Sequence, residues 1–326
     1  MRLAAWLPLA GAPDWGFVDG GRGGSVPRLY RWALGTGQLR AEGRSPSSLL
    51  DYLYHGGGRA ELARLAALAG GAPPTDLDGQ PFWVELQDLE LLPPVQHPPA
   101  FRDFYTFEQH VRAARARRGL EMPPEWYEAP VFYYSNPHAL LASGLPVARP
   151  RACRELDFEL EVAAVLERGG RDLSPEEGET RILGLAILND WSARDVQRRE
   201  MKVGLGPSKG KDFATSLGPW VTTVDELADR RVGRGRYDLA MAARVNGREV
   251  SRANLKDMHF DFGRLVAHAS EGVYLHPGEV LGSGSAGTGC ILELGPENVP
   301  WLEPGDLVEL EVERLGVLRN TVVAPD

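Results

Sequence analysis

Short apolar runs separated by turn residues constrain the fold more than any other feature of this sequence. Beyond residue 95, six runs have strand-like composition, at residues 158–166, 183–188, 240–245, 279–281, 290–294 and 307–313. Asn246-Gly247 follows the third run and predicts a tight hairpin. Helical patterns are few and short there, and they do not alternate with the strands. We therefore expect an α+β fold with a large, mainly antiparallel sheet.

A proline-dense segment divides the chain. Residues 91–99 contain four prolines, and such segments are stiff and extended, which suits a domain boundary near residue 95. The chain has 326 residues, enough for two domains, so we expect a small β-rich domain over 1–95 and a larger one over 96–326. In the first part we predict a strand within 1–13, a helix capped by Ser45 with Pro46 at its first position, and a second helix over 59–68.

Charge and apolar patterning exclude several classes of protein. A net charge of −9 would repel a phosphate backbone, which argues against general nucleic-acid binding. No apolar run approaches the length of about 18 residues that a membrane span requires. Pro8 interrupts the only stretch that resembles a signal peptide, and a single Arg2 precedes it. We expect a cytoplasmic protein without membrane or nucleic-acid partners.

Two nucleotide-binding patterns fail in context. Residues 282–287 read G-x-G-x-x-G, but the strand-like run 290–294 follows where a helix is needed. Gly210-Lys211 resembles the end of a P-loop, but Leu205 stands at the first glycine position and Asp212 at the Ser/Thr position. We discard both interpretations.

Acidic residues alternate with apolar ones at residues 156–162. On a strand, Asp157, Glu159 and Glu161 would share one face, and crowded buried carboxylates favour a hard divalent cation. Glu309 and Glu311 alternate in the same way near the C-terminus, so the spacing alone leaves a solvated strand face open for both segments.

Two helices near these acids carry further candidates. Asp190 ends a buried run, and we expect Ser192 to cap a helix on which Arg194, Gln197 and Met201 face one way. The other helix should start at a capping box formed by residues 106–109 and run to about residue 118. Its spacing turns His110 inward.

Together these segments resemble the fumarylacetoacetate hydrolase family, and within it the fumarylacetoacetases. The likeness is carried in order by Asp103-Phe104-Tyr105 with Gln109-His110, by LDFELE at 156–161, by NDWSARD at 189–195, by Gly210-Lys211 with Phe213 and Thr215, by Gly218-Pro219-Trp220, and by Leu292-Glu293-Leu294. The resemblance implies a mixed β-roll catalytic domain behind a small β-barrel-like N-terminal domain. It also implies a homodimer and a role in aromatic catabolism such as tyrosine degradation.

The resemblance also assigns roles to individual residues. It implies Mg²⁺ or Ca²⁺, with Mn²⁺ as a further option, held by Asp103, Glu159, Glu161 and Asp190 with Lys211 beside them, and a second, structural cation loop at Thr215. His110 matches the general base and Glu293 the carboxylate that orients it. Arg194, Gln197 and Lys211 match groups that polarise keto oxygens. Tyr105, Arg118 and Tyr133 (or its neighbour Tyr134) match the substrate-carboxylate site, where Ser285 replaces the threonine of the family pattern.

The implied activity is hydrolysis of a carbon–carbon bond in a β-diketo acid such as fumarylacetoacetate or an acylpyruvate. Met201 departs from the family pattern, since fumarylacetoacetases place a tyrosine there. A metal-dependent 2-oxo acid decarboxylase, hydratase or isomerase is therefore an alternative. A third alternative is a metal-stabilised binding protein with a vestigial site.

Overall fold

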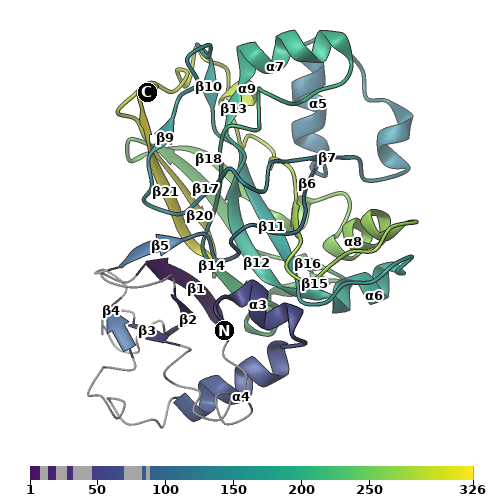
Figure 1. Cartoon of the computed structure of the whole chain (residues 1–326). Helices are drawn as coiled ribbons and strands as arrows, with labels where there is room; N and C mark the ends of the chain where they lie inside the picture. Colours follow the sequence, from purple (N-terminus) through teal and green to yellow (C-terminus); the bar gives the residue numbers. More distant parts are fainter. Residues whose placement is uncertain (8–13, 20–27, 32–45, 70–82, 86–88, 326) are drawn as a thin grey trace.

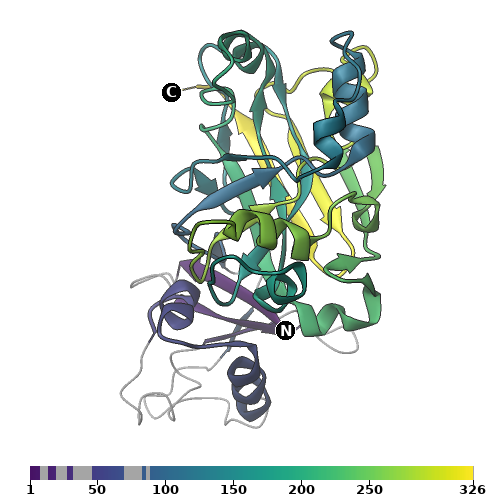
Figure 2. The same cartoon turned by 90° about the vertical axis from the view of Figure 1, so that its right-hand side faces the viewer.

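A large sheet organises the structure, a computed structural model that describes residues 1–7, 14–19, 28–31, 46–69, 83–85 and 89–325 (Figures 1 and 2). Its twelve described strands follow the order β4-β3-β2-β1-β14-β12-β11-β19-β6-β7, with β5 beside β1 and β8 beside β14. All pairs are antiparallel except β19 with β6 and β14 with β8. The strands are β1 (Arg2–Leu7), β2 (Asp14–Asp19), β3 (Arg28–Arg31), β4 (Trp83–Glu85), β5 (Glu90–Leu92), β6 (Phe101–Phe104), β7 (Phe132–Tyr134), β8 (Leu140–Leu141), β11 (Leu160–Leu166), β12 (Ile182–Asn189), β14 (Thr215–Thr223) and β19 (Val280–Gly282).

A second sheet of five strands has the order β18-β17-β20-β21-β9. Its strands are β9 (Val147–Ala148), β17 (Ala240–Val245), β18 (Arg248–Asn254), β20 (Leu307–Val312) and β21 (Gly316–Val323). The predicted hairpin is confirmed, because Asn246 and Gly247 link β17 to β18 with φ of 53° and 76°. Two short pairs complete the strands: β10 (Leu156–Asp157) with β13 (Ser192–Ala193), and β15 (Arg231–Gly233) with β16 (Arg236–Tyr237).

The apolar runs at 158–166 and 183–188 correspond to β11 and β12, which are buried on both faces. Val162 and Ala164 pack into a cluster that includes Leu310 of the second sheet. Ala163 and Val165, which point the other way, join a cluster that includes Leu49 of the N-terminal part. Burial on both faces explains why residues 162–166 of β11 and 182–188 of β12 include no polar or charged side chain. The expected α+β class with a mainly antiparallel sheet is confirmed.

The helices lie around the sheets in separate groups. Helices α5 (Glu108–Ala116), α7 (Arg194–Glu200) and α9 (Ile291–Leu294) gather at the end of the molecule away from the N-terminal strands (Figure 1). Helices α6 (Pro175–Thr180) and α8 (Phe262–Ser270) pack against each other. Helix α4 (Arg59–Ala69) confirms the prediction for 59–68. Helix α3 (Leu49–Tyr54) is capped by Ser48, whereas the predicted cap, Ser45, lies outside the described residues.

The N-terminal strands extend the large sheet. β1 pairs antiparallel with β14 and also with β5, and the described strands β2, β3 and β4 continue the sheet outward without closing a barrel. The boundary near residue 95 stays a prediction, because one sheet joins both parts of the chain. Among the described residues, no helix has the length and apolar character needed to cross a bilayer.

Candidate active site

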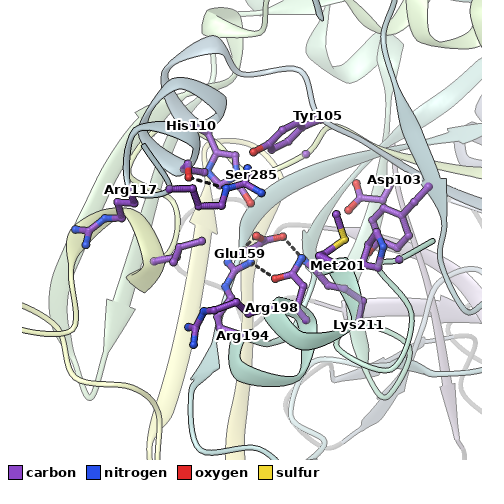
Figure 3. A pocket seen from close by; sticks show the side chains of 18 of the residues that line it. Asp103, Tyr105, His110, Arg117, Glu159, Arg194, Arg198, Met201, Lys211 and Ser285 are labelled. Carbon is purple, nitrogen blue, oxygen red and sulfur yellow. Dashed lines mark hydrogen bonds and ion pairs between the residues drawn. The ribbon is translucent and has the colours of Figure 1, made fainter. Parts of the chain in front are cut away.

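A cavity of about 960 Å³ opens beside α5, α7 and the start of β11 (Figure 3). Its lining includes most of the residues that the sequence predicts for a site: Asp103, Tyr105, His110, Arg118, Tyr133, Glu159, Glu161, Arg194, Gln197, Met201, Lys211 and Ser285. These residues come from segments spread over more than half of the chain. The fold therefore brings them together around one volume.

Four carboxylates form an acidic cluster: Asp103 on β6, Glu159 directly before β11, Glu161 on β11, and Asp190 directly after β12. The first three line the cavity. One oxygen of each of the four lies within 4.8 Å of the others, and all four residues are buried. The expected continuous strand is interrupted at residues 158–159, where the Glu159 amide donates to the Asn189 side chain at 2.9 Å. Because of this break, Asp157 leaves the face that the alternation predicted for it.

Two basic side chains, Lys211 and Arg194, bind carboxylates of this cluster (Figure 3). The Lys211 ammonium lies 2.5 Å from a Glu159 oxygen and 2.6 Å from an Asp190 oxygen. Arg194 Nη2 donates to Glu159 at 2.7 Å, and the Tyr133 hydroxyl donates to Asp190 at 2.6 Å. Burial would raise the pKa of Glu159, but Lys211 and Arg194 outweigh it and hold that pKa well below the usual range.

For the other three carboxylates, burial has the largest effect on the pKa, and for Asp103 and Asp190 it outweighs the favourable interaction with Lys211. Burial, reinforced by neighbouring carboxylates, raises the pKa values of Asp103, Glu161 and Asp190. Asp103 Oδ1 and Asp190 Oδ1 are buried with no hydrogen-bond partner among the described residues. Orphaned carboxylate oxygens in an all-oxygen group are suited to a hard divalent cation, so the acidic cluster could hold one.

His110 lies on the inward face of α5, as the sequence predicts. Its Nδ1 hydrogen-bonds Oε1 of Glu293, whose Oε2 accepts the Thr288 amide at 3.0 Å. This arrangement leaves Nε2 as the ring nitrogen that can exchange a proton with the cavity. The predicted capping box is wrong, because α5 begins at Glu108 and the Thr106 hydroxyl donates instead to the Ser283 carbonyl at 2.6 Å.

Glu293 is carried by α9, which corrects the strand predicted at 290–294. Asp157 accepts the Ile291 amide at 2.7 Å and the Leu292 amide at 3.0 Å. A carboxylate distant in the sequence therefore caps these residues as a helical turn, which no local pattern indicates. The G-x-G-x-x-G segment is thus followed by a helix, but of only four residues, too short for a dinucleotide fingerprint.

Helix α7 presents Arg194 and Gln197 to the cavity, and Met201, directly after the helix, also lines it, as the spacing predicts. Arg194 Nη1 donates to Gln197 Oε1 at 3.1 Å, which leaves the Gln197 NH₂ group as a donor. The predicted Ser192 cap is wrong. Ala193 is the N-cap, and the Ser192 hydroxyl donates to the Asp190 carbonyl at 2.9 Å.

Of the other predicted residues, some line the cavity and some do not. Ser285 Oγ lies 3.4 Å from a Glu161 oxygen. Tyr133 reaches the cavity, whereas Tyr134 is 65% exposed and stacks against the Arg102 guanidinium. Thr215 is buried at the start of β14, outside the cavity lining, so the cation loop predicted there stays a prediction.

Sequence reasoning missed several residues of the site. Arg198 lines the cavity and pairs with Glu155, and Trp301 adds an apolar wall. The position of Arg198, one helical turn after Arg194, is a signal that was available in the sequence. By contrast, no spacing indicates that Trp301 reaches the cavity.

Glu309 and Glu311, which alternate with apolar residues as Glu159 and Glu161 do, belong to no such cluster among the described residues. They are only half-buried on β20, and Glu311 pairs with Arg244.

Known proteins resemble this chain over most of its length. Residues 100–323 match the family model described as fumarylacetoacetate (FAA) hydrolase C-terminal. The chain is 29% identical over 286 residues to a fumarylacetoacetase of Oryza sativa, covering 70% of this chain and 66% of that protein. It is 30% identical over 255 residues to the Bos taurus fumarylacetoacetase, covering 63% and 61%. The chain thus spans slightly under two thirds of the length of these curated relatives.

Solved structures share the fold over nearly the whole chain. A fumarylacetoacetate hydrolase from Exiguobacterium antarcticum aligns with a TM-score of 0.72 at 24% identity, covering 99% of both chains. A maleylpyruvate hydrolase from Sphingobium, solved with manganese(II) and pyruvate, aligns with a TM-score of 0.69 at 21% identity and full coverage of both. Since the family model matches well over half of its length, the chain belongs to the fumarylacetoacetate hydrolase family, as the resemblance in its sequence predicted.

Proposed function

We propose that this protein is a divalent-cation-dependent hydrolase that cleaves a carbon–carbon bond in a β-diketo acid such as fumarylacetoacetate or an acylpyruvate. One observation carries the proposal: His110, which is hydrogen-bonded to Glu293, lines the same cavity as three of the four carboxylates of the acidic cluster. A base that activates water and a group of carboxylates that fits a hard cation are the two parts that this reaction needs.

In the proposed reaction, His110 Nε2 takes a proton from water, and the hydroxide adds to a substrate carbonyl carbon. Glu293 holds the ring through Nδ1 and stabilises the imidazolium that forms. The new C–O bond is followed by cleavage of the adjacent C–C bond, whose electron pair remains on the leaving carbon as an enolate. The imidazolium returns its proton to that carbon. Water is thereby consumed and two acids are released.

Lys211 and Gln197, which line the same cavity as His110, supply donors for the substrate oxygens. Lys211 has three N–H groups, of which two bind Glu159 and Asp190. Its third N–H and the NH₂ group of Gln197 can donate to the oxyanion. Asp103, Glu159, Glu161 and Asp190 would hold Mg²⁺, Ca²⁺ or Mn²⁺. When bound, the cation supplies Lewis-acid stabilisation of negative charge on a substrate oxygen.

The alternative reaction is decarboxylation, hydration or isomerisation of a 2-oxo acid. Met201, which places a thioether in the cavity at a position where the family pattern has a tyrosine, is the observation that favours it. A homodimeric, cytoplasmic enzyme of aromatic or tyrosine catabolism is part of the same proposal.

A substrate panel tests the proposed function. We expect fumarylacetoacetate or an acylpyruvate to lose its diketone absorbance with Mg²⁺ or Mn²⁺ and to stop doing so with a chelator. Chromatography should find two acids as products. Turnover of only oxaloacetate or a 2-oxo-pentenoate would favour the alternative reaction. If no compound of the panel is turned over in a metal-dependent way, the protein would be a binding protein with a vestigial site.

Arg118 offers a second test, on substrate affinity. Its Nε donates to the Ala114 carbonyl at 3.2 Å, and the described residues give it no carboxylate partner. A free guanidinium at the cavity can bind a substrate carboxylate. We expect Arg118→Gln to raise KM about tenfold, the loss of one charge-assisted hydrogen bond, with a smaller change in kcat. Arg115→Gln is the control, because Arg115 lies in the last turn of α5, three residues before Arg118, and outside the cavity lining. Equal KM values for both variants would contradict this role.

A further inference from the structure

We propose that Asp157 is a positioning residue that couples the general base to the substrate-binding arginine. This inference rests on the proposed function and extends it, because Asp157 does not line the cavity. Its side chain is fully buried. It contacts the segment that carries Glu293 and the Arg194 side chain, and it lies two residues before Glu159.

The first contact of Asp157 is with the helix that carries Glu293. Both carboxylate oxygens accept backbone amides, Oδ1 from Ile291 and Oδ2 from Leu292. Helix α9 has only four residues and no side-chain cap of its own, since Cys290 occupies the N-cap position without a cap hydrogen bond. A helix this short does not persist without tertiary contacts. Asp157 therefore fixes the turn that aims Glu293 at His110.

The second contact is with Arg194. Asp157 Oδ2 accepts Arg194 Nε at 2.7 Å, while Arg194 Nη2 binds Glu159 at 2.7 Å. The guanidinium is 4% exposed, so its direction is set by these two carboxylates and by Gln197. The Asp157 carboxylate thus binds both α9, which carries Glu293, and the Arg194 guanidinium. Its Oδ2 is shared between the Leu292 amide and Arg194, so a change at one contact affects the other.

Kinetics of Asp157→Asn test the coupling. The amide keeps the size of the side chain but replaces one acceptor oxygen with a donor. We expect kcat to fall about 30-fold, within the 10–100-fold range of outer-shell substitutions, and KM to rise severalfold. The kcat loss should shrink to under about threefold when Glu293→Gln is already present, and the KM change should shrink when Arg194→Lys is present. Undiminished losses in both backgrounds would overturn the proposal.

Glu167 supplies a matched control. Like Asp157, it is a buried carboxylate that accepts a backbone amide and an arginine, in this case both from Arg59, and it lies outside the cavity lining. Glu167→Gln should lower the thermal stability, but it should not produce the fall in kcat and the rise in KM expected for Asp157→Asn. If both variants gave the same kinetic pattern, Asp157 would have only a general structural role.

A readout independent of activity separates this inference from the proposed function. Cys290 and Cys153 are both fully buried; Cys290 adjoins α9, whereas Cys153 lies four residues before Asp157. In Asp157→Asn we expect a thiol reagent to label Cys290 about tenfold faster, as for the loss of about one hydrogen bond, and Cys153 at the wild-type rate. Equal acceleration at both cysteines would indicate general loosening and contradict the proposal, whatever substrate the wild-type enzyme accepts.

If Asp157→Asn fails to fold, Ile291→Pro removes one of the hydrogen bonds from the other side. Ile291 is the first residue of α9, where proline is tolerated, and Cys290 before it is extended with φ −152° and ψ 159°. We expect the same selective labelling of Cys290. Unchanged labelling of Cys290 would overturn the capping role of Asp157.

Discussion

Replacing His110 with alanine is expected to lower kcat by about 10³-fold, the largest effect among single substitutions in the cavity. His110 is buried, hydrogen-bonded through Nδ1 to Glu293, and part of the cavity lining. No other histidine of the described residues lines this cavity, so none can replace His110 as the base. Because the alanine variant keeps the acidic cluster and Arg118, KM should stay within about twofold of the wild-type value. Initial rates with the substrate found in the panel measure both constants.

The control for this variant is His276→Ala. His276 is exposed, lies outside the cavity lining, and contributes a backbone amide rather than its ring to its hydrogen bond with Glu279. It should retain wild-type kcat. A His110→Ala enzyme with unreduced kcat would mean that water is activated elsewhere, and the mechanism proposed above would then be wrong.

Replacing Glu161 with glutamine is expected to change stability in opposite directions with and without a divalent cation. Glu161 is fully buried, and its oxygens accept the Gly284 amide at 3.1 Å and the Ser285 hydroxyl at 3.4 Å, both neutral. Burial and three neighbouring carboxylates raise its pKa well above the usual range. The neutral amide removes this repulsion, so the variant should have a higher Tm than the wild type in a chelator.

With the cation present the order should reverse. Ligand binding stabilises the folded state by about 2.7 kcal/mol at 100 times Kd, so Mn²⁺ should raise the Tm of the wild type. Loss of one charged ligand should weaken Mn²⁺ binding by more than about 100-fold and abolish that rise. Calorimetric titration and thermal melts with and without Mn²⁺ measure both effects.

Glu311→Gln is the control for the acidic cluster. Glu311 alternates with apolar residues as Glu161 does, but it is half-buried on β20 and paired with Arg244. It should bind Mn²⁺ as the wild type does. If Glu161→Gln kept the wild-type Mn²⁺ affinity, the acidic cluster would not be the cation site.

The sequence by itself determined the elements whose pattern is local. Apolar runs predicted β11 and β12, because a strand buried on both faces needs apolar residues at most of its positions. Asn246-Gly247 predicted the β17–β18 hairpin, since these residues tolerate positive φ. Helical spacing placed His110 inward and put Arg194, Gln197 and Met201 on one face. The family motifs, read in order, indicated which residues would meet.

Only the tertiary structure decided the features whose hydrogen-bond partners are distant in the sequence. Residues 290–294 have the composition of a strand, but Asp157 holds them as a helical turn. The Thr106 hydroxyl binds Ser283 rather than capping α5, and β1 pairs with β14 across more than 200 residues. In each case a polar group buried by folding binds the nearest available partner, and which partner is nearest depends on chain packing, which local propensity does not encode.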